Sequence, residues 1–242
     1  MRDTVIPVLR HLRVSFIQVR AFFAEKISNK RRTLILAPHP DDEVMGCGGL
    51  IQRLSQQGNP PHVIILSGGG KSHAGCCGIE EDLLTAERRS AARRILSNLG
   101  LPESHLHLLD FPDGGISLTH PEMEQLRALM SAINPETVFI PHQGEGWPDH
   151  LVCRDLVKAI PSLNSAPVYE YCVWFWYYNV WNLDWKNATV LRMSPEEHVA
   201  KCQAVDDYTT ALAPCGKPWA GVLPKLLVAA AKWDKELYFK VR

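Results

Sequence analysis

Four residues near the start of the sequence combine side chains that bind metals and move protons. His39, Asp41, Asp42 and Glu43 lie within five positions, between an apolar run and a glycine cluster. Because like charges repel, buried carboxylates are costly unless a cation pairs with them. The segment is therefore either solvated surface or a cation-binding site.

A divalent ion such as zinc suits this chemistry. Imidazole and carboxylate are ordinary zinc ligands, and a catalytic zinc takes three protein ligands and leaves one position for water. The pKa of that water falls to ~7, and a carboxylate that does not bind the metal can accept its proton. Two adjacent aspartates in a turn can divide these roles, one facing the metal and the other the water.

Short apolar runs alternate with helical patterns from residue 33 onward, which predicts an α/β domain with a parallel sheet covered on both faces. The expected strands cover residues 33–38, 62–67, 105–110 and 137–141. The expected helices are one opened by Gly46–Gly49, one around 92–99, one capped by a box of Thr119 and Glu122, and one from about Asp149 to Pro161.

This arrangement predicts where the chemistry lies. Ligands of open parallel sheets bind beyond the carboxyl ends of the strands. His39 follows the first expected strand, and a second imidazole, His150, follows the fourth. We expect both histidines at the same edge of the sheet.

The first 32 residues predict a separate amphipathic helix. Apolar residues recur there at spacings of three and four, at Leu9, Leu12, Phe16, Val19 and Phe23. Arg10, Arg13 and Arg20 lie off that face. The favoured interpretation is a helix whose apolar stripe packs on the domain or on a second copy of it, and the alternative is a basic helix resting on a membrane surface.

Composition narrows the class of protein. The 242 residues carry 26 basic and 26 acidic side chains, so nothing in the net charge favours nucleic acid as a partner. No apolar run reaches the ~18 residues that span a membrane. The seven cysteines are odd in number and include no Cys-x-x-Cys pair, which argues against a zinc ribbon or a secreted disulfide framework and fits a reducing cytoplasm.

The motif "PHPDDE" at 38–43, followed by "GCGG", resembles the signature of the PIG-L/LmbE family of zinc-dependent N-deacetylases. The resemblance extends over roughly residues 33–155, and "WPDH" at 147–150 is similar to the second motif of the family. It implies that His39, Asp42 and His150 bind zinc and that Asp41 is the general base.

Weaker resemblances concern the substrate. The segment "FPDGGI" resembles a family segment whose aspartate, here Asp113, holds sugar hydroxyls. Arg88 or Arg89 matches a substrate-facing arginine of the family. From the residues alone, the loop "SGGGKS" at 67–72 adds Lys71, with His73 just beyond it, as candidate substrate contacts.

One position departs from the family pattern. Many members have histidine where this chain has Trp147, and indole cannot deliver a proton at neutral pH. Losing one oxyanion donor typically costs ~10²–10³ in rate. Either another histidine takes the role, with His142 the nearest in sequence, or turnover is slow.

The segment 169–185 holds nine aromatic residues among seventeen. Aromatic faces stack on sugar C–H groups, so this segment is either a carbohydrate-facing wall or core and subunit interface.

We therefore expect a Rossmann-like three-layer α/β domain over residues 33–242, with a mainly parallel sheet, preceded by the helix of residues 1–32. The expected activity is zinc-dependent removal of the acetyl group from an N-acetylglucosamine-type sugar or glycoconjugate in the cytoplasm. A zinc amidase acting on a non-sugar amide, and a metal-binding protein with little turnover, are the alternatives. A homo-oligomer is compatible with this expectation.

Overall fold

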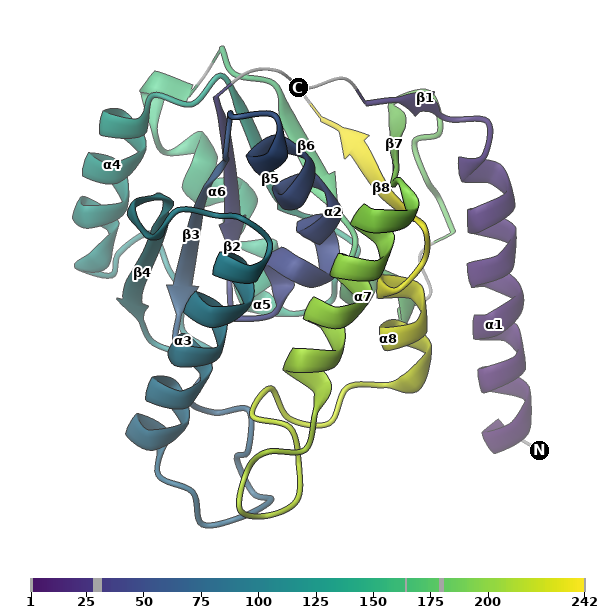
Figure 1. Ribbon diagram of the computed structural model, residues 1–242, viewed down its shortest axis with the longest axis horizontal. Helices are drawn as coiled ribbons and strands as arrows, with labels where there is room; N and C mark the ends of the chain where they lie inside the picture. Colours follow the sequence, from purple (N-terminus) through teal and green to yellow (C-terminus); the bar gives the residue numbers. More distant parts are fainter. Residues whose placement is uncertain (1, 28–31, 164, 179–180, 242) are drawn as a thin grey trace.

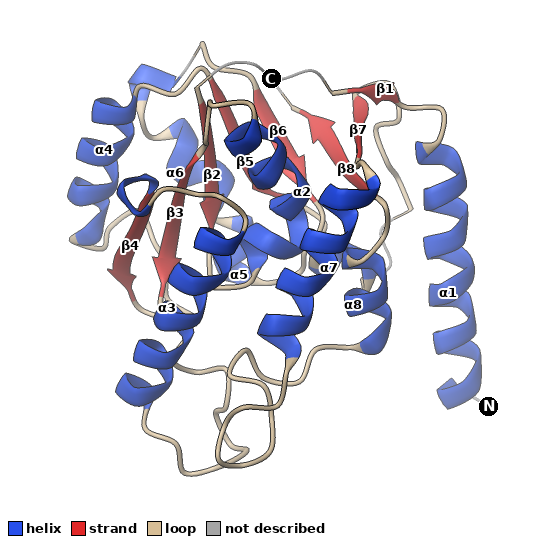
Figure 2. Cartoon of the chain, in the orientation of Figure 1, coloured by secondary structure: helices blue, strands red, loops and turns tan. Residues whose placement is uncertain are grey.

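An eight-stranded sheet with helices on both faces forms the core of the described part of the chain (Figure 2). The computed structural model describes residues 2–27, 32–163, 165–178 and 181–241. The strands are β1 (Glu25–Lys26), β2 (Thr33–Ala37), β3 (His62–Ser67), β4 (Leu106–Phe111), β5 (Thr137–Pro141), β6 (Val168–Tyr171), β7 (Ala188–Arg192) and β8 (Lys235–Lys240). The helices are α1 (Arg2–Ala21), α2 (Asp42–Gln56), α3 (Glu81–Asn98), α4 (Glu122–Ile133), α5 (Pro148–Leu151), α6 (Cys153–Lys158), α7 (Pro195–Thr209) and α8 (Lys225–Ala231), with single 3₁₀ turns at Glu103–His105, Pro161–Leu163 and Trp174–Trp176.

The sheet is mainly parallel, as the alternation of strands and helices predicts. Its order is β1-β7-β8-β6-β5-β2-β3-β4, and β8 runs antiparallel to both of its neighbours, β6 and β7. In the register of the central strands, Leu34 of β2 lies opposite His62 of β3 and Val138 of β5. The expected three-layer α/β class is confirmed.

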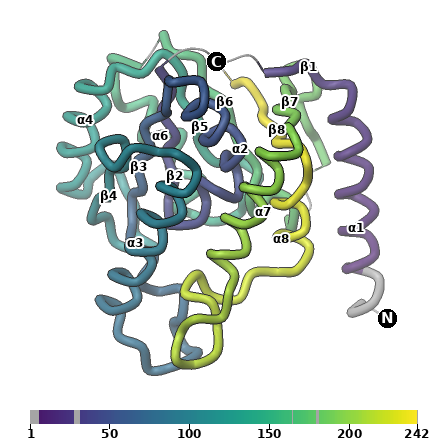
Figure 3. The backbone as a smooth tube through the Cα atoms, in the orientation of Figure 1, coloured from purple at the N-terminus to yellow at the C-terminus, as the bar shows by residue number. Residues whose placement is uncertain are grey.

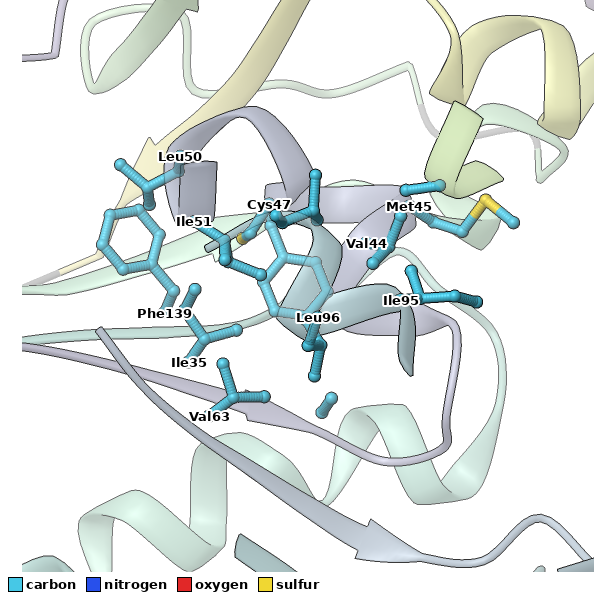
Figure 4. Close-up of a cluster of buried hydrophobic side chains, with 14 of the residues drawn as sticks. Ile35, Val44, Met45, Cys47, Leu50, Ile51, Val63, Ile95, Leu96 and Phe139 are labelled. Atoms are coloured by element: carbon cyan, nitrogen blue, oxygen red, sulfur yellow. The ribbon is translucent and has the colours of Figure 1, made fainter. Parts of the chain in front are cut away.

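Alternate side chains of the strands enter two separate cores. Ile35, Val63 and Phe139 pack against α2 and α3 on one face of the sheet, in a cluster with Ile51 and Leu96 that Figure 4 shows. The intervening side chains, such as Leu34 of β2 and Ile64 of β3, pack against α4 and α6 on the other face. Because both faces are covered, the central strands β2, β3 and β5 are almost entirely apolar.

The chain changes direction across the sheet beside β2. From β2 it proceeds to β3 and β4 on one side and then returns to β5 on the other side (Figure 1). Such a switch point leaves a crevice outside the carboxyl ends of the two central strands, which is where ligands bind in open α/β sheets. The segments that follow β2 and β5 border this crevice.

The glycines after the first motif lie inside α2 rather than before it, since the helix already begins at Asp42. Their role is close packing. A Cβ atom at Gly46 would collide with the ring of Tyr171, and one at Gly49 would collide with the side chain of Met193. The glycines therefore allow β6 and the segment before α7 to approach α2.

The expected capping box of Thr119 and Glu122 does not form. The Thr119 hydroxyl pairs with Ser117, and the Glu122 carboxylate accepts the N–H of Asp110 instead. A capping box is present at α7, where Ser194 and Glu197 exchange the two hydrogen bonds.

Helix α1 packs on the domain through a different face from the expected one. Val14, Ile17 and Ala21 are buried against the cluster that contains Phe175. Arg13, expected off the packed face, is also buried, and its Nη1 donates to the carbonyl of Phe175 at 3.0 Å. The side chains of the expected stripe are exposed, namely Leu9, Leu12, Phe16, Val19 and Phe23.

The domain therefore does not cover the apolar stripe of α1, so contact with a second copy or with a membrane surface stays a prediction. In the described residues, no helix combines the length and the apolar character that crossing a membrane requires. The domain boundary at residue 32 also stays a prediction. The segment before it contributes β1 to the sheet, where β1 pairs with β7.

The packing of α1 can be tested by comparing two apolar residues of this helix. Ile17 is 1% exposed and Leu12 is 60% exposed. We expect Ile17→Ala to lower the free energy of unfolding by ~2–5 kcal/mol, because it leaves a cavity in a packed cluster. Leu12→Ala should change it by less than ~0.5 kcal/mol. Denaturant unfolding of both variants measures this, and the reverse order would show that the stripe faces the domain.

Candidate active site

A pocket of about 440 Å³ lies at the carboxyl ends of the central strands, within the size range of small-molecule sites. Segments that follow β2, β3, β4 and β5 contribute to it, together with residues 220–223. Its lining consists of His39, Asp41, Asp42, Lys71, Ser72, Arg88, Asp113, Gly114, Trp147, Pro148, Asp149, His150, Trp174, Ala220, Gly221, Val222 and Leu223. The structure thus brings both sequence motifs to one cavity.

Three side chains from the two motifs converge on one point. The Oδ2 atom of Asp42 lies 3.3 Å from His39 Nδ1 and 3.4 Å from His150 Nε2. A tetrahedral zinc ion with bonds of ~2.0–2.2 Å separates its nitrogen and oxygen ligands by ~3.3–3.5 Å. The spacing of these three atoms therefore fits a zinc ion, and they form one of the ligand groups in the described residues that could hold a metal.

Charge at this cluster also favours a cation. Burial acts to raise the pKa of Asp42, but the charges of His150 and His39 lower it, so the carboxylate is ionised. Burial acts to lower the pKa of His39, yet its contacts with Asp113, Asp149 and Asp42 raise that pKa well above its ordinary value. The acidic groups around His39 therefore favour a positive charge at this point, which suits a bound cation.

The other nitrogen of His39 has carboxylate partners. Its Nε2 lies 3.2 Å from Asp149 and 3.2 Å from Asp113. Asp149 is itself held by the N–H groups of Gly114, at 2.7 Å, and Ile116, at 3.2 Å. A histidine that binds a metal usually donates its second N–H to a carboxylate, which fixes the ring. Asp149 and Asp113 are placed to give His39 this support.

His150 is oriented by a buried carboxylate that the sequence patterns did not single out. Its Nδ1 faces Glu145 Oε2 at 3.5 Å. Glu145 is fully buried and accepts the backbone N–H groups of Val173, at 2.8 Å, and Trp174. It precedes the "WPDH" motif by two residues, and this proximity was the only signal for it in the sequence.

Asp41 occupies a strained position directly before α2. Its φ of 132° lies in a region that residues with a Cβ rarely adopt. The conformation is held at both ends of the residue, because its N–H donates to Glu43 at 3.0 Å and its carbonyl accepts the N–H of Met45 at 2.9 Å. Strain of this kind persists only where the surroundings enforce it, and it concentrates at functional sites.

The Asp41 carboxyl lines the pocket and pairs with Arg88, whose Nη2 lies 3.2 Å from its Oδ2. Burial raises the pKa of Asp41 to about 7; Arg88 opposes this shift, and the charges of Asp42 and Glu43 add to it. A carboxyl group with a pKa near neutrality is suited to exchanging protons at neutral pH.

Arg88 is held inside the protein rather than directed only toward the pocket. Its guanidinium also donates to the carbonyls of Pro40, at 2.7 Å, and Gly69, at 2.8 Å. Gly69 has a φ of 67°, and a Cβ there would collide with the guanidinium. These contacts favour positioning of Asp41 over direct substrate binding. The other expected match, Arg89, instead pairs with Asp110 of β4.

Asp113 and Lys71, the remaining expected substrate residues, line the pocket side by side. The backbone N–H of Lys71 donates to the Asp113 carboxylate at 2.8 Å. His73 is absent from the lining and is almost fully buried elsewhere. Of these three expected substrate residues, Lys71 and Asp113 therefore line the pocket and His73 does not.

His142 lies outside the pocket, so the geometry does not support it as a substitute for the family histidine. Its ring packs edge-on against Phe175 and Phe239, and its Nδ1 accepts the N–H of Gly144 at 2.8 Å. Burial lowers the pKa of His142 to about 4. Trp147 instead lines the pocket and is 46% exposed. Its ring is edge-on to that of Trp174, with the ring centroids 5.6 Å apart.

The aromatic-rich segment divides between the pocket and the core, and its contact with a carbohydrate stays a prediction. Trp174 lines the pocket, whereas Phe175 and Trp176 are buried in the cluster under α1.

Helix α7 supports the first motif and the helix α2 that follows it. The Tyr208 hydroxyl donates to Glu43 at 2.6 Å, and burial raises the pKa of that glutamate to about 7. Lys201 forms a buried ion pair with Glu236 at 2.5 Å, and Glu236 also accepts the N–H of Gly49 at 2.8 Å. Lys201 and Tyr208 are the first and last residues of the segment "KCQAVDDY" at 201–208.

Comparison with known proteins identifies the family. Residues 34–160, more than half of the chain, match the family model PIG-L, described as GlcNAc-PI de-N-acetylase. The chain therefore belongs to the PIG-L family, as the first motif indicated. A curated relative, the diacetylchitobiose deacetylase of Thermococcus kodakarensis, is 28% identical over 131 residues, which are 52% of this chain and 47% of that protein. The chain spans about half the length of this relative.

Solved structures share the fold. The N,N'-diacetylchitobiose deacetylase of Pyrococcus horikoshii superposes with a TM-score of 0.57 at 21% identity, over 74% of this chain and 70% of that one. The 4-carboxy-2-hydroxymuconate hydratase of Pseudomonas putida KT2440 superposes with a TM-score of 0.64 at 16% identity, over 87% and 96%. Because proteins named for two different reactions share this fold, the fold alone does not specify the activity.

The metal cluster can be tested by elemental analysis of protein purified without added metal. We expect His150→Ala to contain about one equivalent of zinc less than the unaltered chain, because it removes one of three protein ligands. His142→Ala is the matched control and should keep its full metal content, since that imidazole lies outside the cluster. An unchanged content in His150→Ala would remove His150 from the site.

Proposed function

We propose that this member of the PIG-L family is a zinc-dependent deacetylase that hydrolyses the acetamide of an N-acetylglucosamine-type sugar or glycoconjugate. The products would be acetate and a free amine. The observation that carries the proposal is the convergence of His39, Asp42 and His150 on one point, beside the Asp41 carboxyl, in a pocket of substrate size. The name of the Thermococcus relative supports the substrate class.

Zinc would be held by His39, Asp42 and His150, with Asp149 and Asp113 fixing the His39 ring. When bound, it would polarise the acetyl carbonyl and lower the pKa of a water molecule. One carboxylate in the ligand set leaves positive charge on the ion, which favours this chemistry over a site with two carboxylates.

Asp41 is the general base of the proposal. It would accept a proton from the attacking water and return it to the leaving nitrogen. Arg88 would hold one carboxylate oxygen in place, since its Nη2 lies 3.2 Å from Asp41 Oδ2. A cation at the neighbouring cluster would favour the ionised form of Asp41, which is the form that a base requires.

The remaining pocket residues suit a sugar. Asp113 offers acceptor oxygens for hydroxyl groups, and Lys71 adds a donor nearby. Trp147 and Trp174 form an aromatic edge on which the C–H face of a sugar ring would stack. Trp147 is 46% exposed, which is compatible with a sugar that carries a further group, such as a lipid or a glycan.

Trp147 also favours a second candidate function, a metal-binding family member with slow turnover. The described pocket lining contains no imidazole besides those of His39 and His150, both assigned to the metal. The indole can donate one neutral hydrogen bond to an oxyanion but cannot protonate an amine.

A cytoplasmic setting is part of the main proposal, because all seven cysteines are free of disulfides.

Acetate release from a panel of N-acetylated sugars and non-sugar amides tests the activity. We expect the purified chain to hydrolyse N-acetylglucosamine-type sugars, to lose activity on dialysis against a chelator, and to recover it with zinc. Release only from non-sugar amides would overturn the sugar assignment. No release from any compound, with the metal bound, would favour the protein of slow turnover.

The two adjacent aspartates should separate metal binding from proton transfer. We expect Asp41→Asn to keep zinc and to lose ~10²–10⁴ in kcat, the usual worth of a general base. Asparagine has nearly the same size and shape as aspartate, so this variant removes the charge with little change in packing. Asp42→Asn should lose zinc and activity together. If Asp41→Asn emptied the site while Asp42→Asn kept its metal, the two roles would be exchanged.

A further inference from the structure

A second group of metal-ligand side chains lies where two loops meet beyond α3 and α7. One loop follows β3 and carries His73, Cys76 and Cys77, and the other joins α7 to α8 and carries Cys215. Figures 1 and 3 show these two loops side by side at the lower end of the molecule. The four ligand atoms all lie within 4.8 Å of one another.

The distances resemble those of a tetrahedral zinc site. The Nδ1 atom of His73 lies 3.1 Å from Cys77 Sγ, 3.5 Å from Cys215 Sγ and 3.9 Å from Cys76 Sγ. The two adjacent sulfur atoms are 3.4 Å apart. Zinc bonds of ~2.0–2.1 Å to nitrogen and ~2.3 Å to sulfur separate tetrahedral ligands by ~3.6–3.8 Å.

Hydrogen bonding aims the histidine at the sulfur atoms. His73 is 2% exposed, and its Nε2 lies 2.8 Å from the carbonyl oxygen of Pro218. Since a carbonyl only accepts, Nε2 must carry the proton, which leaves the lone pair of Nδ1 directed toward the three cysteines. A backbone carbonyl on the second nitrogen is a usual support for a ligating histidine.

A lysine balances the charge of the cluster. The Nζ atom of Lys217 lies 2.9 Å from Cys76 Sγ. Three thiolates and one zinc ion carry a net charge of −1, which an adjacent ammonium offsets. Sulfur and imidazole ligands together select zinc and similar soft or borderline ions.

We propose that His73, Cys76, Cys77 and Cys215 bind a structural zinc ion that clips the two loops together. All four positions are filled by protein, as in structural rather than catalytic zinc sites. The adjacent cysteines lack the Cys-x-x-Cys spacing, and the fourth ligand is remote in sequence. A search for paired motifs therefore gives no sign of this site.

The clip would shape one wall of the active-site pocket. Lys71 and Ser72 lie just before His73, and residues 220–223 follow Cys215 by a few positions; both segments line the pocket. The Ser72 hydroxyl also donates to the carbonyl of Trp219 at 3.0 Å, between the same loops. Loss of the ion should therefore raise KM more than it lowers kcat. This consequence for KM rests on the proposed function, whereas the metal site itself does not.

Cobalt substitution of the full chain tests the site without an activity measurement. The His150→Ala variant, in which the active-site cluster is impaired, is stripped of metal under reducing conditions and titrated with Co²⁺. We expect about one equivalent to give the sulfur-to-cobalt charge-transfer bands and tetrahedral d–d bands of thiolate coordination. Adding Cys215→Ser should strongly reduce the charge-transfer absorption, and adding Cys202→Ser, a cysteine outside the cluster, should leave it unchanged.

A second measurement needs no cysteine variant, so it remains decisive if Cys215→Ser fails to fold. Zinc X-ray absorption of the His150→Ala protein should show a sulfur shell at ~2.3 Å. A zinc-loaded protein without sulfur neighbours, or a Co²⁺ titration without charge-transfer bands, would overturn the proposal. Disulfides among these cysteines in protein kept under reducing conditions would overturn it as well.

Discussion

Negative charge buried beside the carboxyl ends of β2 and β5 is the constraint on which the site depends. Asp41, Asp42 and Glu43 are consecutive and 7%, 2% and 0% exposed. Carboxylates at such depth require partners. Arg88 forms an ion pair with Asp41, and the Tyr208 hydroxyl donates a hydrogen bond to Glu43. Asp42 has the two imidazoles, and the acids around His39 raise the pKa of that imidazole, so this point favours positive charge.

The scaffold around α2 follows from this constraint. Glycines in its first turns let Tyr171 and Met193 approach the helix, and the Lys201–Glu236 pair packs against the same turns. The Tyr171 hydroxyl donates to the carbonyl of Leu36 at 2.9 Å, which ties β6 to the strand that carries the motif. Removing one partner of the buried Lys201–Glu236 pair would cost far more stability than the pair contributes, because a buried charge would be left unpaired. The residues that pack against α2 are therefore constrained as closely as the residues of the site.

The sequence predicted the parts of the molecule that depend on local pattern. The parallel sheet follows from apolar runs, and the convergence of His39 and His150 follows from their places after two strands. Parts that depend on remote contacts were missed or wrong. The packed face of α1 includes Arg13, which reaches the carbonyl of Phe175, and the Thr119 box fails because the Glu122 carboxylate accepts the N–H of Asp110. Nothing local shows that Cys215 meets Cys76 and Cys77, or that His142 is enclosed by aromatic rings.

The central claim is that one ion binds between the two motifs and that Asp41 stays free of it. Anomalous diffraction at the zinc edge, from crystals of the full chain, tests this most directly. The account predicts a peak in contact with His39 Nδ1, Asp42 and His150 Nε2, with Asp41 outside the coordination sphere. A peak on the opposite side of His39, between Asp113 and Asp149, would contradict it, as would coordination by Asp41.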